Sequence, residues 1–169
     1  MKIGVGVSKA LSLLIVWCMI ISSFAGLLIF TVPEAGQALP PSEDANGDRF
    51  IGSDYENDTW YISGLQNLNG NLTIGAGGTV VVENGVLNFL SYQTATVSRV
   101  HHLTIEDGGA LILTNSNLTV ENSLYGAYKA LGVLVRNGGL LMAENSTLDF
   151  QGKMLIDDAS FIANGTQIN

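Results

Sequence analysis

Oxygen-bearing side chains recur at alternate positions in one short segment, as they do where a loop wraps a hard cation. Asp44, Asn46 and Asp48 begin the segment and Asp54 follows them. Carboxylate and amide oxygens are the ligands that Ca²⁺ takes in proteins. Arg49 stands where such a loop needs a turn glycine, so an acidic, turn-rich linker remains the alternative. Calcium is the one cofactor that the sequence suggests.

The same segment resembles the calcium loops of dockerins and thrombospondin-type repeats, which share the Asp-x-Asn-x-Asp opening. The resemblance implies that Asp44, Asn46, Asp48 and Asp54 bind calcium. It covers about a dozen residues in a single copy. Asp54 also departs from the pattern, because it comes one place before the usual twelfth-position acid, where Tyr55 stands.

Asparagine supplies a second kind of candidate chemistry, because several asparagines lie in Asn-x-Ser/Thr sequons, the acceptors of N-linked glycans. The five sequons begin at Asn57, Asn71, Asn117, Asn145 and Asn164. We expect the last three at the equivalent turn of successive repeats, where glycans would follow one edge. The alternative is that asparagine serves the turn itself, since it tolerates the left-handed conformation.

The sequence predicts no catalytic site. Acids that could act in polysaccharide chemistry show no paired pattern, and Arg99 and Arg136 have no evident partner; these acids are Asp107, Asp149, Asp157 and Asp158. His101 and His102 are neighbours, and neighbours in a strand point to opposite faces, so together they do not suit one metal ion.

Two tyrosines in a loop, Tyr125 and Tyr128, allow two interpretations. They could stack on sugar rings, or they could pack against the wall of the domain. The sequence favours packing, which is the commoner use of an aromatic side chain.

A repeated pattern must position all of these residues. Leu72–Gly78 matches Leu103–Gly109 and Val133–Gly139, and Met154–Ser160 is a weaker copy. Each unit reads as a strand, a Gly-Gly turn, a second strand, an asparagine turn and a third strand. Apolar residues alternate within the strands, as in strands with one buried face. We expect positive φ angles at the paired glycines, which are Gly77, Gly78, Gly108, Gly109, Gly138 and Gly139.

One such unit is too small to bury its apolar face, but stacked units would place Leu over Leu and Ile over Ile. We therefore predict an all-β fold, a parallel β-helix (β-solenoid) of about three to four coils. Insertions in 91–101 and 123–131 explain the longer repeat spacings. An antiparallel sandwich is the alternative. The repeats resemble the right-handed parallel β-helix proteins of the pectin-lyase-like class, in particular repetitive surface proteins of archaea and bacteria.

The N-terminal part reads as a targeting segment. Residues 10–32 are apolar and follow Lys2 and Lys9, which predicts a signal peptide over residues 1–38 or an uncleaved signal anchor helix. Residues 39–59 read as an acidic linker containing the calcium-loop candidate, and residues 60–169 as the repeats. Because the repeat pattern stops midway, we expect the chain to be truncated at its C-terminus.

Charge and composition narrow the function. The chain has fifteen acidic residues and seven lysines and arginines, for a net charge of −8, and no basic cluster follows the apolar segment. Nucleic acid is therefore not expected as a partner. We expect an extracytoplasmic protein, secreted or held in the membrane by its N-terminal segment. It would be a structural or adhesive β-helix module whose partners are surface glycans or other envelope proteins. The alternative is a polysaccharide-binding or polysaccharide-degrading β-helix.

Overall fold

The computed structural model describes residues 40–53, 58–96, 98–121 and 128–169. They lie in one compact unit that spans residues 37–169, and their regular secondary structure consists of β-strands alone. No helix among these residues is long and apolar enough to cross a membrane. The predicted apolar segment 10–32 lies outside the described residues.

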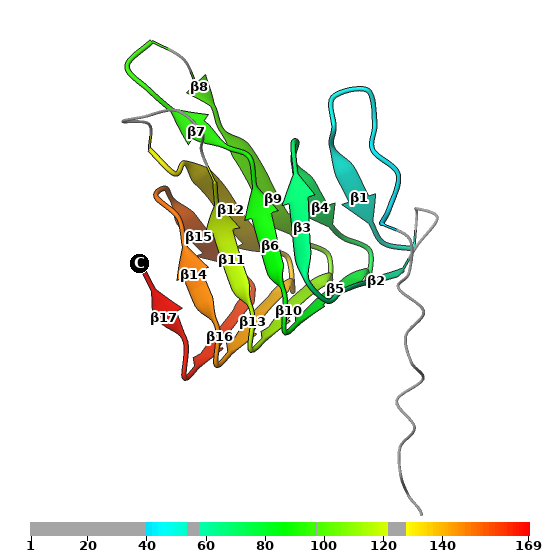
Figure 1. Ribbon diagram of the computed structural model, residues 1–169. Helices are drawn as coiled ribbons and strands as arrows, with labels where there is room; N and C mark the ends of the chain where they lie inside the picture. The colour runs from blue at the N-terminus through cyan, green and yellow to red at the C-terminus, as the bar shows by residue number, and fades with distance from the viewer. Residues whose placement is uncertain (1–39, 54–57, 97, 122–127) are drawn as a thin grey trace, which may run out of the picture. The chain divides into compact units, whose positions relative to one another are not determined.

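Most strands form three parallel sheets of five strands each (Figure 1). Sheet A contains β1 (Arg49–Ile51), β4 (Leu72–Ile74), β9 (His101–Ile105), β12 (Leu131–Arg136) and β15 (Met154–Asp157). Sheet B contains β2 (Thr59–Ile62), β5 (Thr79–Glu83), β10 (Ala110–Thr114), β13 (Leu140–Glu144) and β16 (Ser160–Asn164). Sheet C contains β3 (Leu65–Leu68), β6 (Val86–Phe89), β11 (Asn117–Val120), β14 (Thr147–Asp149) and β17 (Gln167–Ile168).

The chain visits the three sheets in the order A, B, C and then starts again, so the unit is a β-solenoid of five coils. Each strand pairs in register with the strand one coil away: Leu72 lies beside Leu103, and Ile74 beside Ile105. The inward residues are apolar and buried, and Leu87, Leu118 and Leu148 are fully covered at equivalent positions of sheet C. The expected stacking of like residues is therefore confirmed.

Two expectations about extent were wrong. The solenoid has five coils rather than three to four, because its first strand, β1, lies inside the segment expected to be a linker. Sequence alone gave β1 no matching repeat, since its inward residues are Arg49 and Ile51. The repeats therefore begin before residue 60, and Trp60 is buried in β2 of coil 1.

The core at coil 1 is closed by an arginine. The Arg49 guanidinium lies 5.6 Å from the centroid of the Trp60 ring. Its Nη2 is 2.5 Å from a carboxylate oxygen of Glu43, and its Nη1 donates a hydrogen bond to the Pro41 carbonyl. Residues 40–48 therefore cover the first coil rather than linking to it.

The two glycines of each Gly-Gly turn have different structural roles. The first glycines, Gly77, Gly108 and Gly138, have φ angles of 76–78°, so the expectation of positive φ is right for them. It is wrong for the second glycines. There a Cβ atom would lie 2.3 Å from the Ile74 carbonyl oxygen at Gly109, and no real Cβ comes so close to backbone.

Coil 5 makes the same corner with a shorter turn. Leu140 pairs with Ser160, so Ala159 takes the place of the second glycine and the turn has one residue fewer. The alignment of Ser160 with a glycine was therefore off by one position.

The corner between sheets B and C is held by a column of hydroxyl groups. The backbone N–H of Gly85 donates to Ser116 Oγ at 3.1 Å, and that of Ser116 donates to Ser146 Oγ at 3.1 Å. Asn84, Asn115 and Asn145 precede these positions with φ angles of 48–52°. Asparagine adopts this left-handed conformation at less cost than most residues. Turn chemistry thus explains asparagine at this corner.

An antiparallel hairpin interrupts the solenoid between coils 2 and 3. It consists of β7 (Tyr92–Gln93) and β8 (Ser98–Arg99), within the segment predicted to be an insertion. The second predicted insertion, 123–131, runs to the start of β12, and its residues 123–127 lie outside the described residues.

Candidate functional site

Of the four connections that lead from sheet C back to sheet A, the last three lie against one another. Gln93 of β7 and Tyr128 exchange backbone hydrogen bonds of 2.9 and 3.2 Å. The next connection joins them through the Leu131 N–H, which donates to the Gln151 carbonyl at 3.0 Å. Connections that are far apart in sequence thereby form one continuous surface along this corner.

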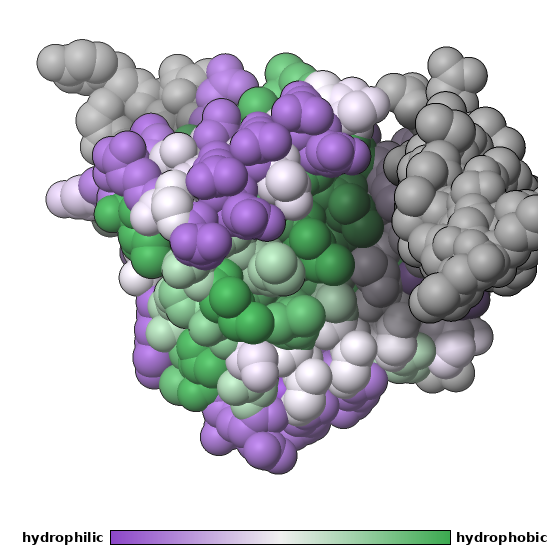
Figure 2. Space-filling view, turned by 90° about the horizontal axis from the view of Figure 1, so that it is seen from below, coloured by the Kyte–Doolittle hydropathy of each residue, from purple (hydrophilic) through white to green (hydrophobic). Residues whose placement is uncertain are grey.

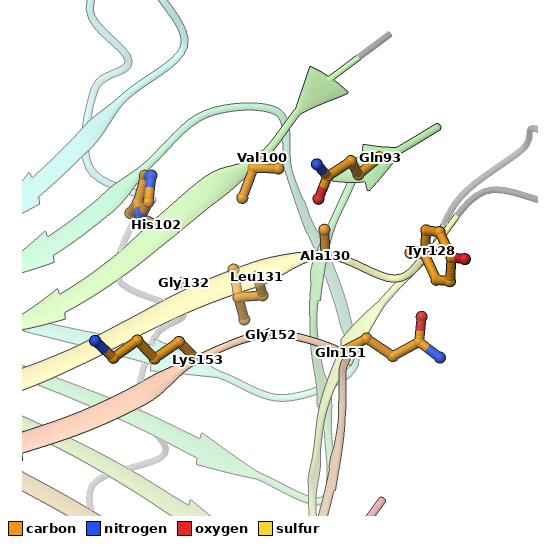
Figure 3. Close-up of a pocket in the computed structure, with 10 residues that line it drawn as sticks. All are labelled: Gln93, Val100, His102, Tyr128, Ala130, Leu131, Gly132, Gln151, Gly152 and Lys153. Atoms are coloured by element: carbon orange, nitrogen blue, oxygen red, sulfur yellow. The ribbon is translucent and has the colours of Figure 1, made fainter. Parts of the chain in front are cut away.

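This corner contains an open groove of about 520 Å³ (Figure 3). Its lining comes from all three connections and from β9 and β12 of sheet A. The lining residues are Gln93, Val100, His102, Tyr128, Ala130, Leu131, Gly132, Gln151, Gly152 and Lys153.

Polar and aromatic groups surround an apolar floor. Ala130 and Leu131 are buried, whereas Tyr128 is 62% exposed. His102, Gln151 and Lys153 are exposed as well, and Figure 3 shows His102 and Lys153 at the end of the groove opposite Tyr128. An exposed aromatic ring can stack on a sugar ring, and amide, imidazole and ammonium groups can bind hydroxyl or carboxylate oxygens.

Two glycines keep the groove open. A Cβ atom at Gly132 would lie 2.4 Å from Nδ1 of His102, so a side chain there would push that exposed ring out of its place beside β12. A Cβ atom at Gly152 would lie 2.0 Å from the Leu131 carbonyl oxygen. Both substitutions would displace groups that line the groove.

A second, polar surface lies on the outer face of sheet C. It forms a groove of about 390 Å³ whose lining includes Asn88, Thr119, Lys129 and Asp149. Lys129 Nζ is 2.5 Å from a carboxylate oxygen of Asp149, and Asn88 donates to Asn67 at 2.7 Å. These polar groups bind one another.

The calcium-loop candidates take part in hydrogen bonds of the fold. Asp44 Oδ1 accepts the backbone N–H groups of Asp48 and Asn46, which lower the pKa of its carboxyl below the ordinary value. Asp48 accepts the backbone and side-chain N–H groups of Asn71 at 2.7 and 3.1 Å. Asp54 lies outside the described residues. Among the described residues, no three His, Cys, Asp or Glu side chains form a group that could hold a metal.

The sequons occupy different environments. Asn71 is partly buried, and its side chain bonds Asp48 and also accepts the His102 N–H at 2.8 Å. Asn117, Asn145 and Asn164 are exposed at the corner between sheets B and C. They share the corner but not the position, because Asn145 lies in the turn, Asn117 begins β11 and Asn164 ends β16. Asn57 lies outside the described residues.

Several other candidates have clear structural partners. Arg136 forms an ion pair of 2.5 Å with Glu106 one coil away, so the expectation that it lacks a partner was wrong. Asp107 Oδ1 accepts a hydrogen bond from the Asn137 side chain at 3.2 Å. Asp157 and Asp158 are exposed in coil 5 and lie at its first corner.

The two histidines point to opposite faces, as predicted. His101 is 9% exposed and faces inward, whereas His102 is exposed in the groove. Burial, and then the charge of Arg99, lower the pKa of His101 below its ordinary value. Its Nε2 atom is buried without a hydrogen-bond partner among the described groups.

Comparisons with protein-family models, with curated proteins and with solved structures find no match to this chain. The class that the structure itself defines is a parallel β-solenoid.

Sequence reasoning found part of the groove. It singled out Tyr128 and His102 but did not connect them, and it missed Gln93, Gln151 and Lys153. The only available signal was positional: each missed residue lies in a connection between two coils, and such connections must stack where the coils stack.

Proposed function

We propose that this chain is an exported, cell-surface structural and adhesive β-solenoid module. The observation that carries the proposal is the in-register stack of five coils, whose insertions and connections meet at the corner from sheet C to sheet A. A stack of repeating coils is a stiff support, and loops held on such a support are a common place for binding groups. The corner groove is then the adhesive contact.

A second candidate function, carbohydrate binding, is favoured by the make-up of that groove. Tyr128 offers an exposed ring, and Lys153 and the amides of Gln93 and Gln151 offer groups that bind sugar oxygens. An acidic polysaccharide fits the lysine best. Degradation of such a polysaccharide, which the resemblance to pectin-lyase-like proteins suggests, needs further acids or a bound metal ion in position.

The handedness of the solenoid, the export of the chain and its glycosylation form part of the same proposal. We propose right-handed winding, because crossovers between parallel strands of one sheet are almost always right-handed. The resemblance to pectin-lyase-like surface proteins supports it. Residues 10–32 direct export, and carbohydrate on the exposed asparagines of the B–C corner would face the extracytoplasmic medium. Mass measurement of the mature protein tests both processing and glycosylation.

A glycan panel tests the adhesive function. The full chain is applied to neutral and acidic polysaccharides, with both retention and the release of reducing or unsaturated ends recorded. We expect retention without cleavage, with a preference for acidic chains. Cleavage would replace the structural proposal with the enzymatic one, and no retention on any surface glycan would remove the carbohydrate-binding candidate.

Matched variants locate the binding. Tyr128→Ala removes the exposed ring from the groove and should weaken retention at least tenfold. Tyr61→Ala removes an aromatic ring that is 46% exposed on sheet B, away from the groove, and should leave retention unchanged. Equal effects of the two substitutions would show that the groove is not the contact.

A further inference from the structure

The outer face of sheet B departs from the usual pattern of a half-exposed sheet, in which outward residues are polar. One outward position is apolar in every coil and forms an in-register row across the sheet. This row, the apolar ladder, consists of Tyr61, Val81, Ile112, Met142 and Ile162. Figure 2 shows a green area on this side of the solenoid, with hydrophilic side chains, in purple, around it.

The other two sheets lack such a row. The middle outward row of sheet A is interrupted by Thr73 and Thr104, although its other members, Phe50, Leu134 and Leu155, are apolar. The middle outward row of sheet C includes Asn88, Thr119 and Asp149. Stability of the coils therefore does not demand an apolar outward residue in every coil. Tyr61 and Ile162 are 46% and 49% exposed, so both ends of the ladder are open to solvent.

Charge is distributed unevenly beside the ladder. On the side that leads to sheet C, the neighbouring outward positions include Glu83 and Glu144. On the opposite side they are neutral: Thr79, Ala110, Leu140 and Ser160. Within the strands, the outward positions beside the ladder are therefore acidic on one side only. The exposed Asp58, Asp107 and Asp158 lie farther out, at the corner with sheet A.

We propose that the ladder is an interface between two copies of this chain, packed face to face with a two-fold axis along the ladder. Sheets that pack face to face keep their strands nearly aligned. Two in-plane axes satisfy that condition, one along the ladder and one along the strands. The axis along the ladder places each acidic border over the neutral border of the other copy. The axis along the strands places Glu83 against Glu144 of the other copy, and like charges disfavour it.

The size of the face determines the strength of the interface. Five strands about 4.8 Å apart and five residues long give a face of roughly 300–400 Å² per copy. A stable dimer buries about 800 Å² per partner. The pairing is therefore weak between free chains and gains strength where chains are concentrated side by side, as on a shared surface.

Cysteine crosslinking of the full chain in mild detergent tests the pairing and its orientation. In a Cys18→Ser background, Val81→Cys is treated with a short bismaleimide. The axis along the ladder brings position 81 of one copy to position 81 of the other, so we expect at least tenfold more dimer than from Asn117→Cys. Asn117 is exposed at the edge of sheet C and is the matched control.

One mixture and one double variant make the result decisive. Val81→Cys mixed with Met142→Cys should give no mixed dimer above the control, because only the rejected axis brings these positions together. Adding Ile112→Glu to Val81→Cys should reduce crosslinking to the control level, whereas Thr104→Glu on sheet A should not. Circular dichroism checks that both variants remain folded.

Three outcomes would overturn the proposal. One is Val81→Cys dimer no more abundant than the Asn117→Cys control. The second is strong 81–142 crosslinking, which would overturn the orientation. The third is a bond within one chain between Cys18 and a cysteine at position 81 when Cys18 is retained, which would show that the N-terminal apolar segment covers the ladder. None of these readouts depends on glycan binding.

Discussion

At the scale of single residues, the Gly-Gly turns combine two separate needs in adjacent positions. Gly108 has a φ of 77° and nothing within 4 Å of where a Cβ would lie, so it serves backbone conformation. Gly109 serves close approach, because the coil before it comes within 2.3 Å of that place. The pair therefore allows the two effects to be measured side by side.

We expect Gly108→Ala to lower the free energy of unfolding by about 1–2 kcal/mol, the cost of the left-handed conformation for alanine. Gly109→Ala should cost about 3 kcal/mol or more, because rigid backbone of the neighbouring coil must move. Urea unfolding followed by circular dichroism measures both. Equal losses would show that coil spacing adapts to the extra carbon.

His101 is a buried titratable group that the fold holds in its neutral form. The lowered pKa follows from burial first and from the charge of Arg99 second, with Asp48 acting in the opposite direction. Because the folded pKa lies below the ordinary value of 6.5, the unfolded chain binds the proton more readily. The contribution of His101 to stability is therefore complete above pH 6.5 and falls as the pH drops below it.

A His101→Gln substitution should remove this part of the pH dependence. Between about pH 7.5 and pH 5.5 the wild-type chain should lose more stability than the variant, because only the wild type has this histidine to protonate on unfolding. Denaturant midpoints at the two pH values give the comparison. His102→Gln is the control, since that side chain is exposed. If the stability of the His101→Gln variant fell with pH as steeply as that of the wild type, the expectation would be contradicted.

At the scale of elements, one serine fastens the hairpin insertion to the solenoid. Ser91 is fully buried, and its Oγ accepts the backbone N–H of His101 at 2.9 Å. The single hydrogen of the same hydroxyl lies within donating reach of two carbonyl oxygens, that of Arg99 at 3.0 Å and that of Ala130. One hydroxyl group thus joins the base of the hairpin, the start of β9 and the connection to β12.

Ser91→Ala should leave the His101 N–H buried without an acceptor and cost about 1–3 kcal/mol of stability. Hydrogen exchange at His101 and Leu131 should also become faster. Ser98→Ala, an exposed position in β8, should change neither quantity. A stable variant with unchanged exchange would mean that water replaces the hydroxyl group.

The strands and corners were predictable where the repeat was visible. The register could be predicted for Leu72, Leu103 and Val133, because identical packing demands similar residues at equivalent positions. Coil 1 was missed because its core is closed by Arg49 and Trp60 rather than by a repeated leucine. The groove was missed because its shape depends on how unlike connections stack, and no local pattern encodes that.

At the scale of the whole molecule, negative charge accumulates on a repetitive scaffold. The chain has 15 acids and seven lysines and arginines, and parallel stacking in register brings equivalent side chains of successive coils close together. Ion pairs such as Arg136–Glu106 offset only part of this charge. Repulsion between like charges destabilises a compact state, and salt weakens it.

We therefore expect the urea midpoint to rise when NaCl is raised from about 0.02 M to about 0.5 M at neutral pH, because the screening length shrinks severalfold. The same increase should have little effect near the isoelectric point of about 4.4, where the net charge vanishes. A fall in the midpoint at neutral pH would show that ion pairs outweigh the repulsion.

The five-coil stack also has a mechanical consequence. Strands lie across the solenoid, so each coil is bonded only to its neighbours and a pull on the chain ends would peel coils singly. Leu141 pairs with Phe161 after 20 residues, whereas Val80 pairs with Leu111 after 31. Peeling would therefore release about 70 Å of extended chain from a short coil and about 100 Å from one with an insertion. Under load the stack would act as a tether that lengthens in unequal steps.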